Sequence, residues 1–192
     1  MELVYEIKAA VARAESKLLP RVTNPNAPKT GLRLVAEDPN SKVNMRRIET
    51  INFQAGTLGE ITQTLNEYSK SEQLRYQKMP IVCLITPFSL SANGDFKQAR
   101  FTLFIACPTS PHWKRYERQV NSFEPVLKPI VREVIRQILA SNSCMTYEND
   151  IRYQEIEHDY WSKEGNASIF NEYVDAIEIR DITINFITNN CQ

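Results

Sequence analysis

The sequence predicts a single α+β domain, residues 1–192, with a largely antiparallel sheet. Two apolar segments, 81–85 and 99–107, have the composition of neighbouring core strands. Amphipathic helical patterns flank them, at 58–70 and in a longer stretch that ends near residue 140. A chain of 192 residues is a common size for one domain, and it buries roughly 70% of its unfolded surface without metals or disulfides.

Composition and charge are those of an ordinary globular protein. Because 23 basic residues balance 23 acidic ones, no overall field attracts nucleic acid or an anionic membrane, and copies of the chain repel one another weakly. The longest aliphatic run, 81–85, is far shorter than the ~20 residues that a membrane span needs. We therefore expect no membrane contact, and we expect the four widely spaced cysteines to be reduced thiols.

The N-terminal third predicts one helix followed by irregular chain. Apolar residues recur at helical spacing over 2–18, and the helix should end near Pro20. The segment PRVTNPNAPKTG has three prolines, so we expect an exposed, extended arm at about 20–30. The segments LRLVAED (32–38) and RRIETINF (46–53) predict short strands around a turn at DPNS.

The helix predicted over 58–70 has a capping box at its start. Thr57 can accept a hydrogen bond from a free amide of the first turn, while Glu60 reaches back to the amide of Thr57. The predicted buried stripe of this helix consists of Leu58, Ile61, Leu65 and Tyr68.

The segment PIVCLITPF predicts a core strand that is buried on both faces at 81–85 and ends at Pro87. SLSANGDF (89–96) then predicts a turn-bearing loop, so that the hairpin connection is about twelve residues long. In the partner strand, 99–107, side chains alternate between two apolar faces.

The stretch CPTSPHW, residues 107–113, combines a thiol, hydroxyls and an imidazole, but it predicts a strand-to-helix corner. Two prolines end the strand, and Thr109 or Ser110 is placed to cap a helix that begins at Pro111. That helix should run over about 111–122. Pro125 and Pro129 predict a break before a longer amphipathic helix to about residue 140.

The C-terminal part predicts further strands. IRYQEIEH (151–158) and DAIEIRDITINFI (175–187) are candidates, joined by a loop with aromatic anchors. In the second of them, the large apolar residues occupy odd-numbered positions up to Ile179 and even-numbered positions from Ile182 to Phe186. This change of face predicts a β-bulge at Arg180-Asp181.

No catalytic or cofactor-binding signature is present. His112 and His158 are 46 residues apart, so a zinc site that includes Cys107 and His112 is disfavoured against a structural thiol. A Cys107–His112 nucleophile pair is disfavoured because a buried thiol has a raised pKa. The scattered carboxylates of 147–161 favour a charged edge strand over a two-carboxylate hydrolase, and no glycine-rich phosphate loop is present. We predict a protein that is not an enzyme and holds no metal or cofactor.

A basic and aromatic cluster follows the corner, at residues 112–118. It favours two alternatives. Lys114, Arg115 and Arg118 can bind nucleic acid, as clustered cations and aromatic residues do. In the other reading, Trp113 and Tyr116 pack a first helical turn onto the sheet, while Arg115 and Arg118 face solvent or a partner.

Three runs of the chain together resemble small virion proteins of tailed bacteriophages and prophages of the Bacteroidetes type. They are TLGEITQTLNEYSKSEQLRYQKMPIVCLITPF, ARFTLFIACPTSPHWKRYERQVNSFEPVLKPIVREVIRQI and DAIEIRDITINF. The resemblance implies a tail-terminator-like fold, a mixed, largely antiparallel sheet flanked by helices. It also implies a structural subunit of the virion neck or tail that forms an oligomeric ring, assembled in the host cytoplasm. The partners would be other copies of the chain and neck, portal or tail proteins, with non-specific contact to genomic DNA in the lumen.

A ring built by rotation requires two different complementary faces on each subunit. The arm at 20–30 and the loop 89–96 are candidates for reaching a neighbour, and aromatic residues are enriched at interfaces. The predicted interface residues are Phe88, Phe96, Trp113, Arg115 and Arg118.

Overall fold

A computed structural model gives the fold of the chain. The structure describes residues 2–19, 33–35, 45–48, 50–71, 78–93, 96–141, 144–147, 152–160, 163–164, 167–168 and 173–187. The arm predicted at 20–30 and the turn predicted at DPNS lie outside these residues.

The predicted α+β class is confirmed, with a mixed and mostly antiparallel sheet flanked by helices. Six of the described strands form the main sheet in the order β3-β4-β5-β10-β6, with β7 also paired to β10. β3 and β4 are parallel, and the other pairs are antiparallel. The helices are α1 (Glu2–Leu18), α2 (Leu58–Lys70), α3 (Arg115–Arg118) and α4 (Lys128–Leu139). The strands are β1 (Arg33–Val35), β2 (Met45–Arg47), β3 (Asn52–Gly56), β4 (Ile81–Asn93), β5 (Phe96–Pro108), β6 (Cys144–Tyr147), β7 (Tyr153–Tyr160), β8 (Lys163–Glu164), β9 (Ala167–Ser168) and β10 (Tyr173–Ile187).

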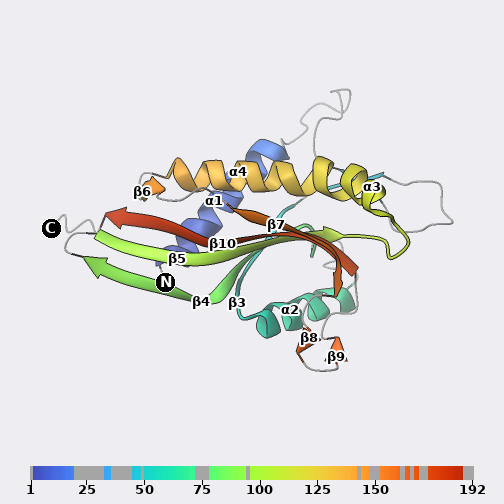
Figure 1. The fold of residues 1–192 in the computed structure, drawn as a ribbon, viewed down its shortest axis with the longest axis horizontal. Coiled ribbons are helices and arrows are strands. Elements are labelled where there is room, and N and C mark those ends of the chain that lie inside the picture. The colour runs from blue at the N-terminus through green and yellow to red at the C-terminus, as the bar shows by residue number, and fades with distance from the viewer. Residues whose placement is uncertain are drawn as a thin grey trace.

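Helices cover the two faces of the main sheet differently (Figure 1). α1 and α4 pack against each other over one face, and α2 lies under the opposite face, close to β3. Side chains of β4 alternate between two buried clusters. Val82 and Leu84 belong to the cluster with α1 and α4, and Ile81 and Cys83 to the cluster with α2. The prediction that this strand is buried on both faces is therefore confirmed.

Two predicted helices are confirmed as α1 and α2. α1 spans residues 2–18 as predicted. At the start of α2, the amide of Glu60 donates to the Thr57 hydroxyl (3.3 Å), and the Glu60 carboxylate accepts from the Thr57 amide (2.8 Å). The Thr57 hydroxyl also donates to this carboxylate (3.0 Å). The hydrogen bonds that the carboxylate accepts, first from the Thr57 amide and then from its hydroxyl, hold the pKa of Glu60 below its usual value.

The predicted break in the second half of the chain is wrong. α3 continues through a π-helical segment, Gln119–Leu127, directly into α4. Pro125 lies inside the π-helical segment, where the wider turn accommodates a residue without a donor amide, and Pro129 lies in the first turn of α4. The two prolines therefore change the type of helix without ending it.

Two strand predictions also need correction. The segment RRIETINF does not form one strand: β2 pairs with β1 in a separate sheet, and β3 joins the main sheet. β4 does not end at Pro87 but continues to Asn93, which pairs with Phe96, so the connection is far shorter than twelve residues. A bulge absorbs Pro87, because the paired positions shift between Ile85 and Ser89.

A second bulge lies at the same level of the sheet, in β10. Its register with β5 shifts between Ile179 and Ile182, which confirms the bulge predicted at Arg180-Asp181. Asp181 has a φ of 59°, in the left-handed region that Asp tolerates better than most residues. Both neighbours of β5 are thus bulged beside Phe101 and Thr102.

Among the described residues, helices cover only one face of the sheet beyond the two bulges. We call this part the open half: Ser89–Asn93 of β4, Phe96–Arg100 of β5 and Ile182–Ile187 of β10. Residues of the open half that face α1 and α4, such as Ala99 and Ile184, are fully buried. On the opposite face, Gln98 donates to Asn185 (3.2 Å), and none of the described side chains of the open half belongs to the cluster with α2. In Figure 1, β4, β5 and β10 extend to the left past α2.

Substitutions of Asp181 test whether the bulge requires the left-handed backbone. Asp181→Gly and Asp181→Val both remove the ion pair with Arg100. The difference between their free energies of unfolding therefore reports the cost of the left-handed backbone conformation. We expect the Val variant to be less stable than the Gly variant by about 1–2 kcal/mol, because a β-branched residue resists positive φ. Urea unfolding measures the difference. Equal stabilities of the two variants would contradict the left-handed assignment.

Candidate functional site

The strand-to-helix corner is held together by Arg118, which is 3% exposed. Its guanidinium donates to Asp175 Oδ1 (2.8 Å) and to the Thr109 hydroxyl (2.8 Å). It also donates to the carbonyl oxygens of Ser110 (2.8 Å) and Trp113 (2.9 Å). One side chain therefore joins α3, β10 and the exit of β5.

The prediction that Arg118 faces solvent or a partner is wrong. Asp175, its ion-pair partner, is fully buried and lies opposite Cys107 in the pairing of β10 with β5. Two opposite charges that are both removed from water require each other, since either one alone in this position is strongly disfavoured. Arg118 is thus part of the interior of the chain.

The start of the helix differs from the prediction for a related reason. Pro111 and His112 form a turn, in which the amide of His112 donates to the Ser110 hydroxyl (3.3 Å). The helix begins at Arg115, four residues later than expected, and the Glu117 carboxylate accepts from the amide of Lys114 (2.8 Å). Thr109 does not cap the helix, because its hydroxyl accepts from Arg118. Arg118 donates to two carbonyl groups of the corner, and the Ser110 carbonyl also accepts from the amide of Trp113 (3.3 Å).

The two most reactive side chains of the corner, Cys107 and His112, differ in their burial. Cys107 is fully buried in the cluster with α1 and α4, and His112 is exposed. Cys83 is also fully buried, and this burial raises the pKa of its thiol. Within the described ranges, no group of three or more His, Cys, Asp or Glu side chains is placed to hold a metal ion. The side chain of His158 lies outside these ranges.

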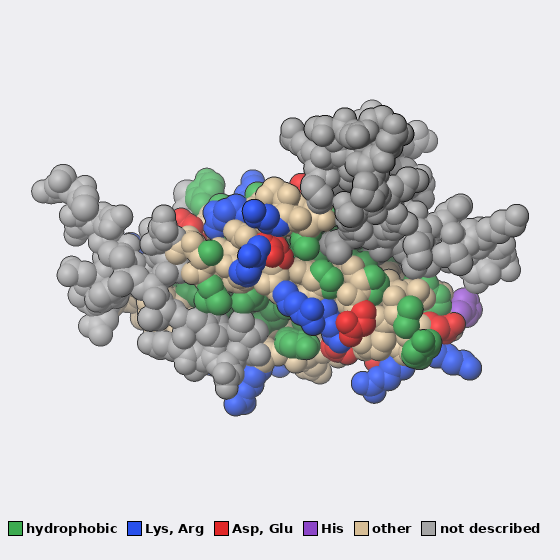
Figure 2. Space-filling model, turned by 90° about the horizontal axis from the view of Figure 1, so that it is seen from above, with side chains coloured by type: hydrophobic (Ala, Val, Ile, Leu, Met, Phe, Trp, Pro, Cys, Tyr) green, Lys and Arg blue, Asp and Glu red, His purple; other side chains and the backbone are tan. Residues whose placement is uncertain are grey.

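Arg115 lies on the exposed side of α3, where it pairs with Glu157 of β7 (3.2 Å). Further polar contacts follow along the helix: Gln119 donates to Glu155 (2.7 Å), and the Lys128 ammonium bonds to Glu155 as well. Hydrogen bonds to Glu124 and to Glu155 raise the pKa of Lys128. These contacts attach β7 to the helices. Figure 2 shows this side of the molecule, where acidic and basic side chains are intermixed.

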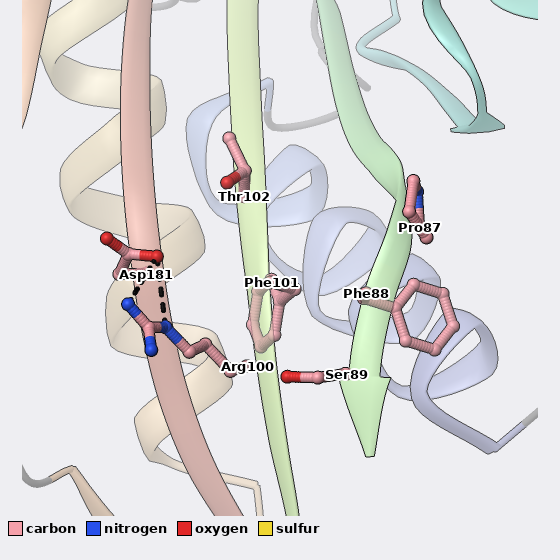
Figure 3. A pocket seen from close by; sticks show the side chains of 7 residues that line it. All are labelled: Pro87, Phe88, Ser89, Arg100, Phe101, Thr102 and Asp181. Carbon is pink, nitrogen blue, oxygen red and sulfur yellow. Dashed lines mark hydrogen bonds and ion pairs between the residues drawn. The ribbon is translucent and has the colours of Figure 1, made fainter.

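A shallow hollow of about 420 Å³ lies at the level of the two bulges (Figure 3). It is lined by Pro87, Phe88, Ser89, Arg100, Phe101, Thr102 and Asp181. Two nitrogens of the Arg100 guanidinium engage Asp181 Oδ1, at 3.0 and 2.9 Å, so the charged groups of the hollow neutralise each other. In Figure 3 the ring of Phe88 lies on the outer side of β4 and points away from β5.

The structure separates the predicted interface residues into two regions. Trp113 and Arg115 lie at the corner with the buried Arg118, whereas Phe88 is half-buried at the hollow. Phe96 is the first residue of β5, and its side chain lies outside the described part.

Sequence reasoning missed Asp175 and the Arg100–Asp181 pair. The only local signal for the former was an acidic residue next to the apolar strand residues Ala176 and Ile177. A carboxylate in a buried strand indicates a buried cation elsewhere in the chain, but not which one. The Arg100–Asp181 pair joins two strands that are 81 positions apart, and the sequence predicted only the bulge.

With this geometry in place, comparisons with known proteins add no family. A scan against protein-family models finds no match, and a search of curated proteins finds none either.

In the described part of the chain, no helix has the length and apolar character needed to cross a membrane.

Alanine substitutions of the two arginines of α3 test the difference in their roles. Arg118→Ala leaves Asp175 without its buried cation, and we expect a loss of about 3–5 kcal/mol in the free energy of unfolding. Arg115→Ala removes an exposed pair and should cost less than about 1 kcal/mol. Urea unfolding of both variants measures the contrast. Similar losses for the two would show that Arg118 is not the buried anchor of the corner.

Proposed function

We propose that the protein is a structural subunit of a tailed bacteriophage that assembles into a ring in the neck or tail, where it connects head and tail or completes the tail. The observation that carries the proposal is the open half of the sheet: among the residues that the structure describes, no helix covers the face that carries Gln98 and Asn185. Such a surface suits contact with another protein. The hollow beside it is shallow, and its two charged side chains, Arg100 and Asp181, pair with each other.

The resemblance of the three sequence runs to small virion proteins supports the same function. The balanced charge of the chain favours association between copies, because 23 basic and 23 acidic residues leave no net repulsion. The partners under this proposal are other copies of the chain, neighbouring neck, portal or tail proteins, and genomic DNA in the lumen. The place of action is the virion.

The nucleic-acid-binding alternative loses much of its basis. Of its three cations, Arg118 is buried and Arg115 pairs with Glu157. The third, Lys114, is exposed, and no ion pair joins it to another of the described residues. Sequence-independent binding to nucleic acid requires several free cations on one surface.

Native mass spectrometry over a range of protein concentrations tests the proposal. We expect closed rings of one defined size with more than two subunits, formed by the chain alone or on co-expression with the neighbouring neck and tail proteins. Arg115→Ser, at a predicted interface residue, should weaken assembly, whereas Lys70→Ser, an exposed cation at the end of α2, should not. A chain that forms no ring of more than two subunits under either condition would overturn the proposal.

A further inference from the structure

The edge of the sheet at Ser89–Asn93 has no neighbouring strand among the residues that the structure describes. β3 pairs with β4 only at Ile81–Ile85, while β4 stays paired with β5 as far as Asn93. The bulge at Pro87 separates the two parts of β4. Ser89, Leu90, Ser91 and Ala92 are all exposed. Backbone groups on the outer side of this segment are therefore available to a further strand.

Beyond the bulge at Pro87, the edge itself carries none of the charges or prolines that usually prevent strand addition. The segment SLSAN contains no charge and no proline, and Leu90 is 56% exposed. By contrast, β7 at the opposite edge of the sheet contains Glu155, Glu157 and Asp159. Natural sheets place charges, prolines or bulges on edges that must stay unpaired. Because Ser89–Asn93 is uncharged and exposes Leu90, its composition is typical of a strand that pairs with another strand on this edge.

The two faces of the segment differ in polarity. Leu90 pairs with Ala99, which is fully buried on the side of α1 and α4, so Leu90 and Ala92 lie on that side. Ser89 pairs with Arg100, at the hollow on the opposite side, and Ser91 shares that face. A partner strand must therefore offer small or apolar residues on one face and polar residues on the other.

We propose that the partner is a second copy of the same segment, paired antiparallel about a twofold axis at Ser91. In this register Leu90 of each copy lies opposite Ala92 of the other, and Ser89 lies opposite Asn93. Apolar residues then meet on the side of α1 and α4, and the serines share the other face. The segment is thus complementary to itself, as a twofold contact requires, and the absence of charge in it means that no repulsion opposes the pairing.

The inference does not depend on the proposed function. A twofold contact closes on itself and makes dimers, whereas a ring requires two unlike faces. The dimer would join the sheets of two subunits into one continuous sheet, whether or not those subunits also belong to rings.

Sedimentation of the wild-type chain and two lysine variants tests the contact. The wild type should show a concentration-dependent dimer, and Leu90→Lys should raise its dissociation constant by at least about a hundredfold, since the substitution acts twice in a twofold contact. Val120→Lys is the matched control, because Val120 is 51% exposed on the π-helical segment, away from this edge, and it should leave the dimer unchanged. Circular dichroism verifies that both variants fold. A monomeric wild type, or equal dimerisation of Leu90→Lys, would overturn the proposal.

Cysteine cross-linking tests the register, in a chain whose Cys144 and Cys191 are replaced by Ser. Opposed residues of an antiparallel pair have Cα atoms about 4.5–5.5 Å apart, which is within disulfide range. Ser91→Cys should therefore link two copies under mild oxidation, whereas Ser89→Cys alone should not. Linking that is as efficient through Ser89→Cys as through Ser91→Cys would contradict the register. If the chain forms no ring but Ser91→Cys still cross-links, only the proposed function is contradicted. If the chain forms rings but Ser91→Cys does not cross-link, only the dimer is contradicted.

Discussion

The buried ion pair between Arg118 and Asp175 is the interaction on which the architecture of the chain depends. The Arg118 guanidinium joins α3 to β10 and to the segment that follows β5. Burial of both charges is costly, so the pair is stable only in the geometry in which each partner is satisfied. That requirement fixes where β5 ends, where the helix begins and how the helix lies on the sheet.

The second constraint is the pair of bulges beside Phe101 and Thr102. β4, β5 and β10 have 13, 13 and 15 residues, more than twice the mean strand length of about 5–6. In the part of the chain that the structure describes, the bulges divide these long strands into a part with helices on both faces and the open half, which has helices on one face. The corner and the bulges thus have separate roles: the first sets the packing of the helices, and the second sets which part of the sheet remains available for contact.

Local patterns in the sequence predicted the elements that local forces determine. The capping box at Thr57, the burial of both faces at 81–85 and the bulge at Arg180-Asp181 each arise from residues within one turn or one strand, and all three are confirmed. The burial of Arg118 could not be predicted in this way, since its partner is 57 positions away. A proline also has no single meaning: Pro87 lies in a bulge and Pro125 in a π-helical turn, and neither ends its element.

A double-mutant cycle on Arg118 and Asp175 tests most directly whether this pair organises the corner. Arg118→Met and Asp175→Leu each leave one buried charge alone, whereas the double variant leaves none. We predict a coupling energy of at least about 2 kcal/mol from urea unfolding, with the double variant far more stable than the sum of the single losses implies. Additive losses would contradict the account, because they would mean that the two charges do not depend on each other.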